Sequence, residues 1–206
     1  MTRTPRTWSG QVFIATSVDG YIARPDGDID WLTDPPEQSE HAAEHPGPDP
    51  APDYDGFIAD VSHLVMGRGT YEKVLTFDGW PYGDRHVIVI STSLAAKSDA
   101  AADERVTVVP SVDAACALLV EEGAGRVYVD GGRVISAFLE RDLIDELVIT
   151  RAPIVLGEGL PLFHALPRST RLVHLGTSTI EAGMISSHYR VERAATAGGE
   201  PADAAR

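Results

Sequence analysis

Three places in the sequence join an apolar run to the start of a helix-like pattern through small or hydroxyl residues. They read LVMGRGTYE around Gly67 and Gly69, VIVISTS up to Ser91 and Thr92, and VYVDGGRV around Gly131. A helix N-terminus attracts anions through its free N–H groups and its dipole, and glycine allows either a tight turn or the close approach of backbone to a ligand. One glycine pair would fit a turn and a binding site equally. Three such junctions favour a nucleotide-type ligand, with Arg68 as a cation beside its phosphates.

Segments with β-strand and helix patterns alternate along most of the chain. We predict strands at 11–18, 63–67, 86–92, 105–110, 125–132 and 144–157, and helices at 70–77, 111–123 and 133–142. Two strongly alternating stretches, 171–180 and 184–193, predict an antiparallel hairpin at the C-terminal end. This order predicts an α/β fold: three α/β/α layers around a mixed, mostly parallel sheet. Such sheets bind ligands at the carboxyl ends of their strands, where the three junctions would meet.

The domain predicted from these patterns spans residues 10–193. We expect residues 1–9 to form a flexible arm, and residues 194–206, rich in Ala, Gly, Pro and Asp, to form a disordered tail. The Pro-rich, acidic segment 34–53 differs from its surroundings. Asp34 resembles a helix cap and Pro46 a helix end, so a short surface helix followed by a loop is expected there.

Composition limits the classes of function. The chain has 206 residues, 43% of them hydrophobic, and a net charge of −14, so it can build one sizeable core but lacks the basic surface that nucleic acid binding needs. No apolar run approaches the roughly 20 residues of a membrane span, and the start of the chain lacks the pattern of a signal peptide. A single cysteine, Cys116, excludes an internal disulfide. We therefore expect a cytoplasmic protein without membrane or nucleic acid partners.

One motif suggests a metal. The sequence HAAEH, from His41 to His45, matches the H-x-x-E-H pattern of a zinc peptidase family, which sets both histidines on one helix face. The expected helix is short, however, Pro46 follows directly, and the flanking residues are too polar to bury a site. A solvated helix explains the motif better, and we predict no metal site.

Several motifs together resemble a known family. FIATSVDGYIA with DIDWL, then LVMGRGTYE, VIVISTS and VYVDGGRVISAFLERDLIDELVITRAPIVLGEGLPLF occur in the order of the dihydrofolate reductase-like superfamily. The resemblance covers about residues 11–192. It is nearest to the branch that contains the reductase domain of bacterial riboflavin biosynthesis. It implies the three-layer fold, NADPH laid across the strand ends, and a homodimer joined through the C-terminal strands.

The resemblance also implies roles for individual residues. Those that match cofactor-binding positions are Ala15, Gly67, Arg68, Gly69, Thr70, Ser91, Thr92, Gly131, Gly132, Arg133 and Val134. In this assignment the residues from Gly67 to Thr70 hold phosphates, Ser91 and Thr92 lie beside the adenosine ribose, and the last four lie over the pyrophosphate and the nicotinamide side. Ala15 faces the nicotinamide. Arg68 and Thr92 are expected to select NADPH over NADH through its 2′-phosphate.

Asp19 and Trp31 match the loop that flanks the active site, although Asp19 also suits a turn and Trp31 a core position. Asp19 and Asp30 are the candidate proton donors. No carboxylate aligns with the one that assists pterin protonation in true dihydrofolate reductases, so folate is not the expected substrate. Glu158 stands where relatives often have glycine, and we expect it to face solvent.

The zinc deaminase signature of complete riboflavin enzymes is absent, since one cysteine cannot supply it. The sequence therefore predicts an NADPH-dependent reductase that acts on a C=N or C=O bond of a small, heterocyclic substrate. A nucleotide-binding sensor or dimeric scaffold without turnover is the alternative function. A flavin or deazaflavin is the alternative cofactor.

Overall fold

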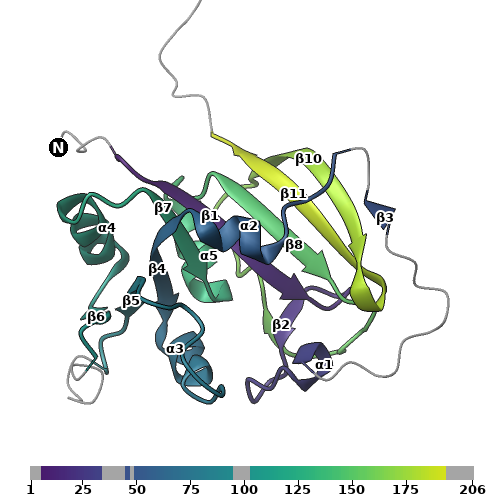
Figure 1. Ribbon diagram of the computed structural model, residues 1–206, viewed down its shortest axis with the longest axis horizontal. Helices are drawn as coiled ribbons and strands as arrows, with labels where there is room; N and C mark the ends of the chain where they lie inside the picture. The colour runs from purple at the N-terminus through teal and green to yellow at the C-terminus, as the bar shows by residue number, and fades with distance from the viewer. Residues whose placement is uncertain (1–5, 34–44, 47–48, 95–102, 194–206) are drawn as a thin grey trace, which may run out of the picture.

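The structure is a computed structural model that describes residues 6–33, 45–46, 49–94 and 103–193 (Figure 1). In this part of the chain one nine-stranded sheet runs in the order β3-β10-β11-β8-β1-β7-β4-β5-β6. Its strands are β1 (Ser9–Thr16), β3 (His45–Pro46), β4 (Val61–Gly67), β5 (His86–Ile90), β6 (Val106–Val109), β7 (Arg126–Asp130), β8 (Glu146–Arg151), β10 (Arg171–Ile180) and β11 (Met184–Glu192). A second, two-stranded sheet pairs β2 (Tyr21–Ala23) with β9 (Leu160–Pro161).

The strands from β8 to β6 run parallel, and β8, β11, β10 and β3 pair antiparallel. The helices are α1 (Asp30–Thr33), α2 (Tyr54–Ala59), α3 (Arg68–Val74), α4 (Val112–Glu121) and α5 (Gly132–Glu140). Among the described residues no helix is long and apolar enough to cross a membrane. The predicted mixed, mostly parallel sheet with a C-terminal hairpin is confirmed.

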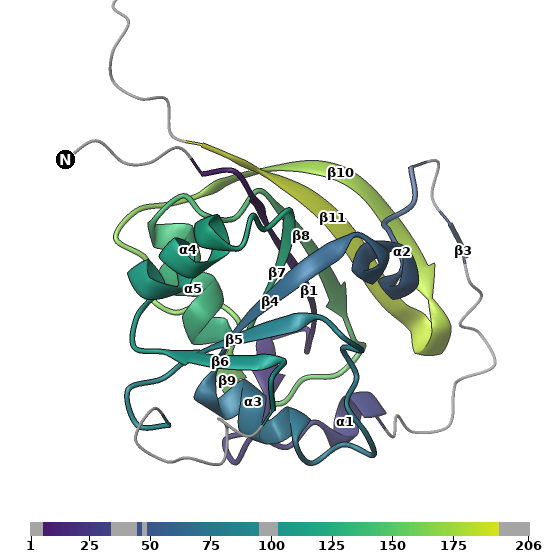
Figure 2. The same ribbon diagram turned by 60° about the vertical axis from the view of Figure 1, so that its left-hand side comes forward.

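Two hydrophobic cores lie on opposite faces of the sheet, because successive side chains of a strand point to opposite sides. In β4, Val65 packs with Phe138 of α5 in one core, whereas Leu64 and Met66 pack with Phe57 of α2 in the other. Helices α4 and α5 lie together on the first side (Figure 2). Helices α2 and α3 supply the second core, which completes the three predicted layers.

The local signals located most elements to within a few residues. The Ser111 side chain caps α4 by accepting a hydrogen bond from the N–H of Ala114, and Gly123 follows the helix with φ +65°. The strand predicted at 144–157 was too long. It ends at Arg151, ahead of Pro153, whose ring removes a backbone donor that a central strand needs.

The expected flexible arm at 1–9 is wrong for its last four residues. The Arg6 guanidinium donates to the carbonyl of Leu143 and to the carboxylate of Asp145, and Trp8 is 4% exposed in the core beside α5. Ser9 already belongs to β1. A buried ring and a paired cation hold this segment in place. Residues 1–5 and the tail predicted at 194–206 lie outside the described residues.

Most of the helix predicted after Asp34 lies outside the described residues, but its expected end is wrong. His45 and Pro46 form β3, which pairs with Thr179 and Ser178 of β10. Just beyond, the sequence analysis missed α2. That helix has only six residues and starts at Asp53, whose side chain accepts a hydrogen bond from the N–H of Gly56. A helix this short is stabilised by packing rather than by a pattern that sequence shows.

Candidate functional site

The three strand ends singled out by the sequence, of which those of β4 and β7 lead into helices, meet at one edge of the sheet. Strand β4 lies between β7 and β5, and the register pairs Met66 with Asp130 and Gly67 with Ile90. All three strands are parallel, so their carboxyl ends point the same way. The edge predicted to bind a nucleotide is therefore assembled from residues more than 60 positions apart.

The junction after β4 is open. Gly67 precedes α3 and provides no capping side chain, and a Cβ placed on Gly69 would meet nothing within 4 Å among the described residues. Arg68 is about half exposed, and its Nη1 donates to the Ser93 hydroxyl at 3.0 Å, while its Nε lies 3.7 Å from Glu72. A cation and free helix N–H groups thus border an empty space, which fits a polyphosphate group.

The junction after β7 is closed by the protein itself. Gly131 has φ +87°, and a Cβ there would lie 2.4 Å from the Thr70 hydroxyl oxygen. A Cβ on Gly132 would lie 2.2 Å from the carbonyl oxygen of Pro161 and 2.9 Å from that of Leu162. The carbonyl oxygens of Pro161 in β9 and of the following Leu162 exclude a side chain at Gly132, so the fold itself already requires this glycine. The predicted role of both glycines in cofactor binding stays a prediction.

The remaining predicted cofactor residues divide into buried and exposed ones. Ser91 is buried, and its hydroxyl accepts hydrogen bonds from the backbone N–H groups of Ser93 and Leu94, so it shapes the turn after β5. Val134 is 7% exposed and packs in the core beside α5. Thr92 and Arg133 are exposed. Among the described residues, no ion pair or hydrogen bond engages the Arg133 side chain, so this edge has a second cation besides Arg68.

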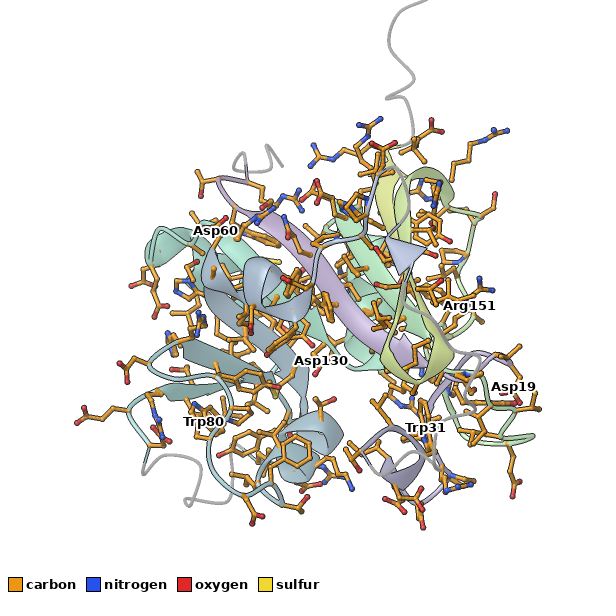
Figure 3. The ribbon with its side chains drawn as sticks, turned by 45° about the vertical axis from the view of Figure 1, so that its right-hand side comes forward. Asp19, Trp31, Asp60, Trp80, Asp130 and Arg151 are labelled. Carbon is orange, nitrogen blue, oxygen red and sulfur yellow. The ribbon has the colours of Figure 1, made fainter. Side chains whose placement is uncertain are left out.

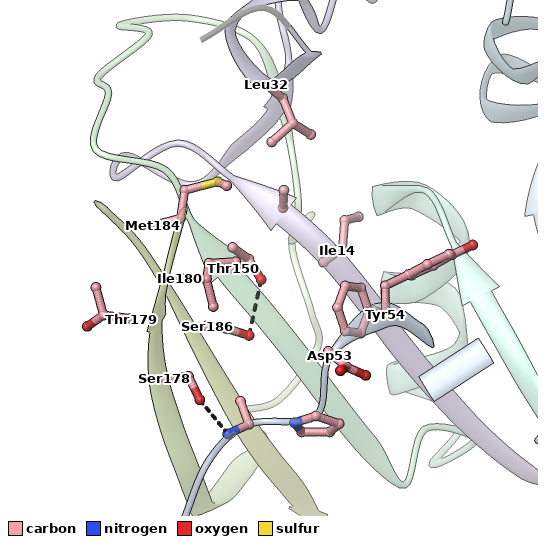
Figure 4. A pocket seen from close by; sticks show the side chains of 14 residues that line it. Ile14, Leu32, Asp53, Tyr54, Thr150, Ser178, Thr179, Ile180, Met184 and Ser186 are labelled. Atoms are coloured by element: carbon pink, nitrogen blue, oxygen red, sulfur yellow. Dashed lines mark hydrogen bonds between the residues drawn. The ribbon is translucent and has the colours of Figure 1, made fainter. Parts of the chain in front are cut away.

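A cavity of about 580 Å³ lies beside this edge, between the end of β1 and the C-terminal hairpin (Figure 4). Ala15, a predicted cofactor residue, lines it. Figure 4 shows the other walls, to which Leu32 of α1, Tyr54 of α2, Thr150 of β8 and Met184 of β11 contribute. The walls are mainly apolar with a few hydroxyl groups, the composition usual for a site that binds a small molecule.

Asp130 is the site residue that the sequence analysis did not assign. It ends β7 near the middle of the molecule (Figure 3), and its carboxylate accepts a hydrogen bond from the N–H of Gly131 at 2.8 Å. Burial raises the pKa of this carboxyl to about 6, against a smaller lowering by the Gly131 N–H. Its charge in turn contributes to raising the pKa of Tyr54, in the cavity wall. An acidic residue that interrupts an apolar strand just before two glycines was the available signal.

The three residues predicted as catalytic lie elsewhere around this edge (Figure 3). The exposed Asp19 carboxylate accepts hydrogen bonds from the N–H groups of Leu156 and Gly157, and thereby fastens the loop after β8. Its pKa is lowered, first by a hydrogen bond from Ser17 and further by those backbone groups. Such a carboxyl stays charged at neutral pH and is a weak proton donor.

Asp30 and Trp31 begin α1. The Arg24 guanidinium donates to Asp30 at 3.1 Å and lowers the pKa of that carboxyl, so Asp30 is also a weak proton donor. Trp31 is 5% exposed, and its indole N–H has no hydrogen-bond partner among the described residues. It lies next in sequence to Leu32 of the cavity wall. The catalytic roles of these residues stay predictions.

This chain is similar to known proteins in sequence as well as in fold. The model of the family described as RibD C-terminal domain matches residues 9–186. The uncharacterized protein YwjB of Bacillus subtilis is 36% identical over 182 residues, which cover 86% of this chain and 95% of that protein. The riboflavin biosynthesis protein RibD of Corynebacterium ammoniagenes is 28% identical over 173 residues, or 76% of this chain and 47% of that protein.

Solved structures agree. A crystal structure from Shewanella sp. PV-4, described as a riboflavin biosynthesis protein, has a TM-score of 0.73 and 36% identity, and the match covers 90% of this chain and 99% of that one. Dihydrofolate reductase from Enterococcus faecalis, complexed with NADP(H), has a TM-score of 0.59 at 19% identity, covering 91% and 98%. The second likeness shows a shared fold, as the motifs predicted.

Proposed function

The chain belongs to the RibD C-terminal domain family, and we propose that it is an NADPH-dependent reductase that transfers a hydride to a C=N or C=O bond of a small, heterocyclic substrate. The observation that carries the proposal is the desolvated carboxyl of Asp130, with a pKa of about 6, where the strand ends meet. The names of similar proteins support a reductase, since they include riboflavin biosynthesis proteins and a dihydrofolate reductase complexed with NADP(H).

The cofactor is proposed to lie across the ends of β7, β4 and β5. The N–H groups at the start of α3 and the guanidinium of Arg68 would hold phosphates in the open space beside Gly69, and Arg133 would reach the pyrophosphate. The Ser93 hydroxyl accepts a hydrogen bond from Arg68 and would help to position it, and Thr92 is still proposed to reach the same 2′-phosphate. When bound, NADPH supplies the hydride from its nicotinamide ring.

Asp130 is the proposed source of the proton that must accompany the hydride. A carboxyl with a pKa of about 6 keeps a fraction of its protons near neutral pH, whereas the lowered pKa values of Asp19 and Asp30 leave those carboxyls ionised. The hydrogen bond from Gly131 engages one carboxylate oxygen. Asp130 does not line the cavity, so the proposal requires its other oxygen to reach a part of the substrate that extends beyond the cavity toward the end of β7.

The cavity limits the substrate class. Its volume of about 580 Å³ suits a molecule of one or two rings, and of the described residues that line it Asp53 and Tyr54 are ionisable. Asp53 already accepts a hydrogen bond as the cap of α2. None of the described lining residues is Lys or Arg. We therefore propose an uncharged or weakly basic ring system rather than a sugar phosphate.

The first test measures NADPH binding and NADPH oxidation with a panel of pterins, uncharged aminopyrimidines and aminopyrimidine sugar phosphates. We expect turnover with an uncharged ring, at a rate that falls as the pH rises through about 6. In Asp130→Asn, turnover should fall by roughly 10²- to 10⁴-fold with NADPH affinity kept. NADPH binding without turnover of any substrate would favour the sensor function. Tight binding of a flavin or deazaflavin, with no binding of NADPH, would favour that molecule as the cofactor.

A second test assigns the cofactor's orientation. A charge-assisted hydrogen bond contributes about 1.5–3 kcal/mol, so Arg68→Ala should weaken NADPH binding roughly ten- to hundredfold and leave NADH binding nearly unchanged. Arg133→Ala is the matched variant, because Arg133 is also an exposed arginine in the first turn of a neighbouring helix, α5. Arg133→Ala should weaken the binding of NADPH and of NADH equally. Equal losses in Arg68→Ala would assign Arg68 to the shared pyrophosphate instead.

A cytoplasmic location and a homodimer joined through β10 and β11 complete the proposal. Exposed apolar side chains on those strands, Leu172 and Ile185, support such a contact. Light scattering on a sizing column tests the dimer, and a mass of 22.1 kDa would identify a monomer.

A further inference from the structure

A second cluster of ionisable side chains lies at the opposite end of the sheet from the nucleotide edge. His63 near the start of β4 and His86 at the start of β5 are directly paired in the strand register, and Glu122 follows α4. The same carboxylate oxygen of Glu122 lies 2.9 Å from Nε2 of His63 and 2.7 Å from Nδ1 of His86. The two histidine side chains are mostly buried, with 12% and 23% of their surfaces exposed, and Glu122 lies at the surface with 30% of its side chain exposed.

The hydrogen bonds around His63 indicate which of its ring nitrogens faces Glu122. The Ser62 hydroxyl donates to the carbonyl of Arg126 and accepts from the N–H of Gly125. With its hydrogen used in this way, the hydroxyl accepts from Nδ1 of His63, 2.9 Å away, and this favours the tautomer with its hydrogen on Nδ1. In a neutral imidazole the lone pair of Nε2 then faces a carboxylate oxygen. Only a second ring proton or a metal ion makes this contact favourable.

His86 is held in a similar way. Its Nε2 lies 2.8 Å from the hydroxyl of Thr107 on β6, which leaves Nδ1 directed at Glu122. Metal-ligating histidines usually have such a hydrogen bond from the ring nitrogen that does not bind the metal, because it fixes the tautomer and the ring orientation. Both histidines have this second partner, on residues that belong to the sheet or border it.

We propose that His63, His86 and Glu122 bind a divalent transition metal ion of the zinc class, with water at the open position beside the half-exposed carboxylate. Two imidazoles and one carboxylate are a common zinc ligand set, with bonds of about 2.0–2.2 Å. Tetrahedral bonds of that length separate the donor atoms by roughly 3.3 Å. The present nitrogen–oxygen distances of 2.7 and 2.9 Å need only a small opening, and the three ligand atoms already lie within 4.8 Å of one another.

The ion would fasten the end of α4 to β4 and β5. Its ligands lie at the amino ends of those strands, whereas Gly67 and Ser91 follow their carboxyl ends. The metal therefore stabilises the fold without contacting the proposed cofactor. Spacing along the sequence could not show this site, since residues 63, 86 and 122 meet only through strand pairing.

The test uses the full chain without an affinity tag, freed of metal with EDTA. Titration calorimetry with Zn²⁺ should show one site, and Co²⁺ should give the absorption bands of a four- or five-coordinate ion. Zn²⁺ should also raise the melting temperature. Glu122→Gln keeps the size and an acceptor oxygen, and it should weaken Zn²⁺ binding at least tenfold, since even outer-shell changes cost about 10–100-fold. His86→Gln should do the same.

The matched control is His188→Gln. His188 pairs with Glu146 at 3.1 Å, but no second histidine of the described chain joins them, so this variant should bind Zn²⁺ like the wild type. The double variant His41→Gln/His45→Gln removes the HAAEH motif and should also keep the affinity. The metal-free Glu122→Gln protein should melt within a few degrees of the metal-free wild type. Absence of a stoichiometric site, or a site lost with HAAEH and kept in Glu122→Gln, would overturn the proposal.

Discussion

The junctions after β4 and after β7 have the same sequence pattern, a strand followed by glycines and a helix, but the structure gives them opposite surroundings. Around Gly69 there is open space, and the neighbouring Arg68 is a half-exposed cation. Around Gly132 the carbonyl oxygens of Pro161 and Leu162 fill the place of a side chain, and the neighbouring charge is the buried carboxyl of Asp130.

The difference shows that a glycine at a strand end can be required by the fold itself or can leave space for a ligand. At Gly132 the close partner is the chain's own strand β9, so this glycine is a requirement of the fold. At Gly69 no described atom would clash with an added side chain, so the open space is available to a ligand. Substitutions at the two junctions should therefore separate stability from binding.

The largest effect is expected for Gly132→Ala. A methyl group 2.2 Å from a backbone carbonyl oxygen forces β9 away from α5, and overpacking of this kind costs about 3 kcal/mol. In a domain of this size the melting temperature should fall by roughly 6–12 °C. Thermal unfolding followed by circular dichroism measures it. An unchanged melting temperature would show that β9 can move away from α5 at no cost in stability and that the junction is not closed.

Asp130→Asn should have the next largest effect, with a characteristic pH dependence. The carboxyl has a pKa of about 6 in the folded chain and about 3.9 in the unfolded chain. Between these values the folded state binds more protons, so stability falls as the pH rises from about 4 to about 6 and stays lowered above. Removing the charge should raise the free energy of unfolding by at most about 3 kcal/mol at pH 7.5 and leave it nearly unchanged at pH 4.

Urea unfolding at both pH values measures this difference. The amide oxygen of the substituted side chain can still accept the hydrogen bond from Gly131, so the comparison isolates the charge. Glu146→Gln is the control, because that carboxylate is already paired with His188. A gain in stability together with a loss of turnover would identify Asp130 as a group kept for function at a cost to the fold. Equal stabilisation at pH 4 would contradict the assigned pKa.

Gly131→Ala should have a smaller effect with two separable parts. An L-residue at φ +87° costs roughly 1–2 kcal/mol, and contact with the Thr70 hydroxyl adds to this. The double variant Gly131→Ala/Thr70→Ala should recover only the contact part. Chemical denaturation of both variants and of Thr70→Ala gives the two terms. Complete recovery in the double variant would mean that the backbone at 131 is not strained.

Much of this molecule could be predicted from its sequence, because its signals are local. Strand patterns, the Ser111 cap and the glycine at 123 located the helices and strands, and the order of the motifs indicated the family. What failed depended on contacts between distant parts of the chain. The Arg6–Asp145 pair, the strand β9 over Gly132 and the pairing of His63 with His86 exist only after folding. Asp130 was visible in the sequence, but its altered pKa comes from burial.

The smallest effect on stability is expected for Gly69→Ala, and this variant tests the open junction most directly. Position 69 lies in the first turn of α3, its φ is not in the positive range, and an added Cβ meets nothing within 4 Å. Alanine favours a helix over glycine, so the free energy of unfolding should stay level or rise by less than about 1 kcal/mol. If phosphates occupy the empty space, the same methyl group would contact them and weaken NADPH binding. The two measurements are the melting temperature and the dissociation constant of NADPH, with Gly125→Ala, at the opposite end of the strands and also without a positive φ, as a control for glycine removal. A stable Gly69→Ala protein that binds NADPH as tightly as the wild type would show that the phosphates lie elsewhere along this edge.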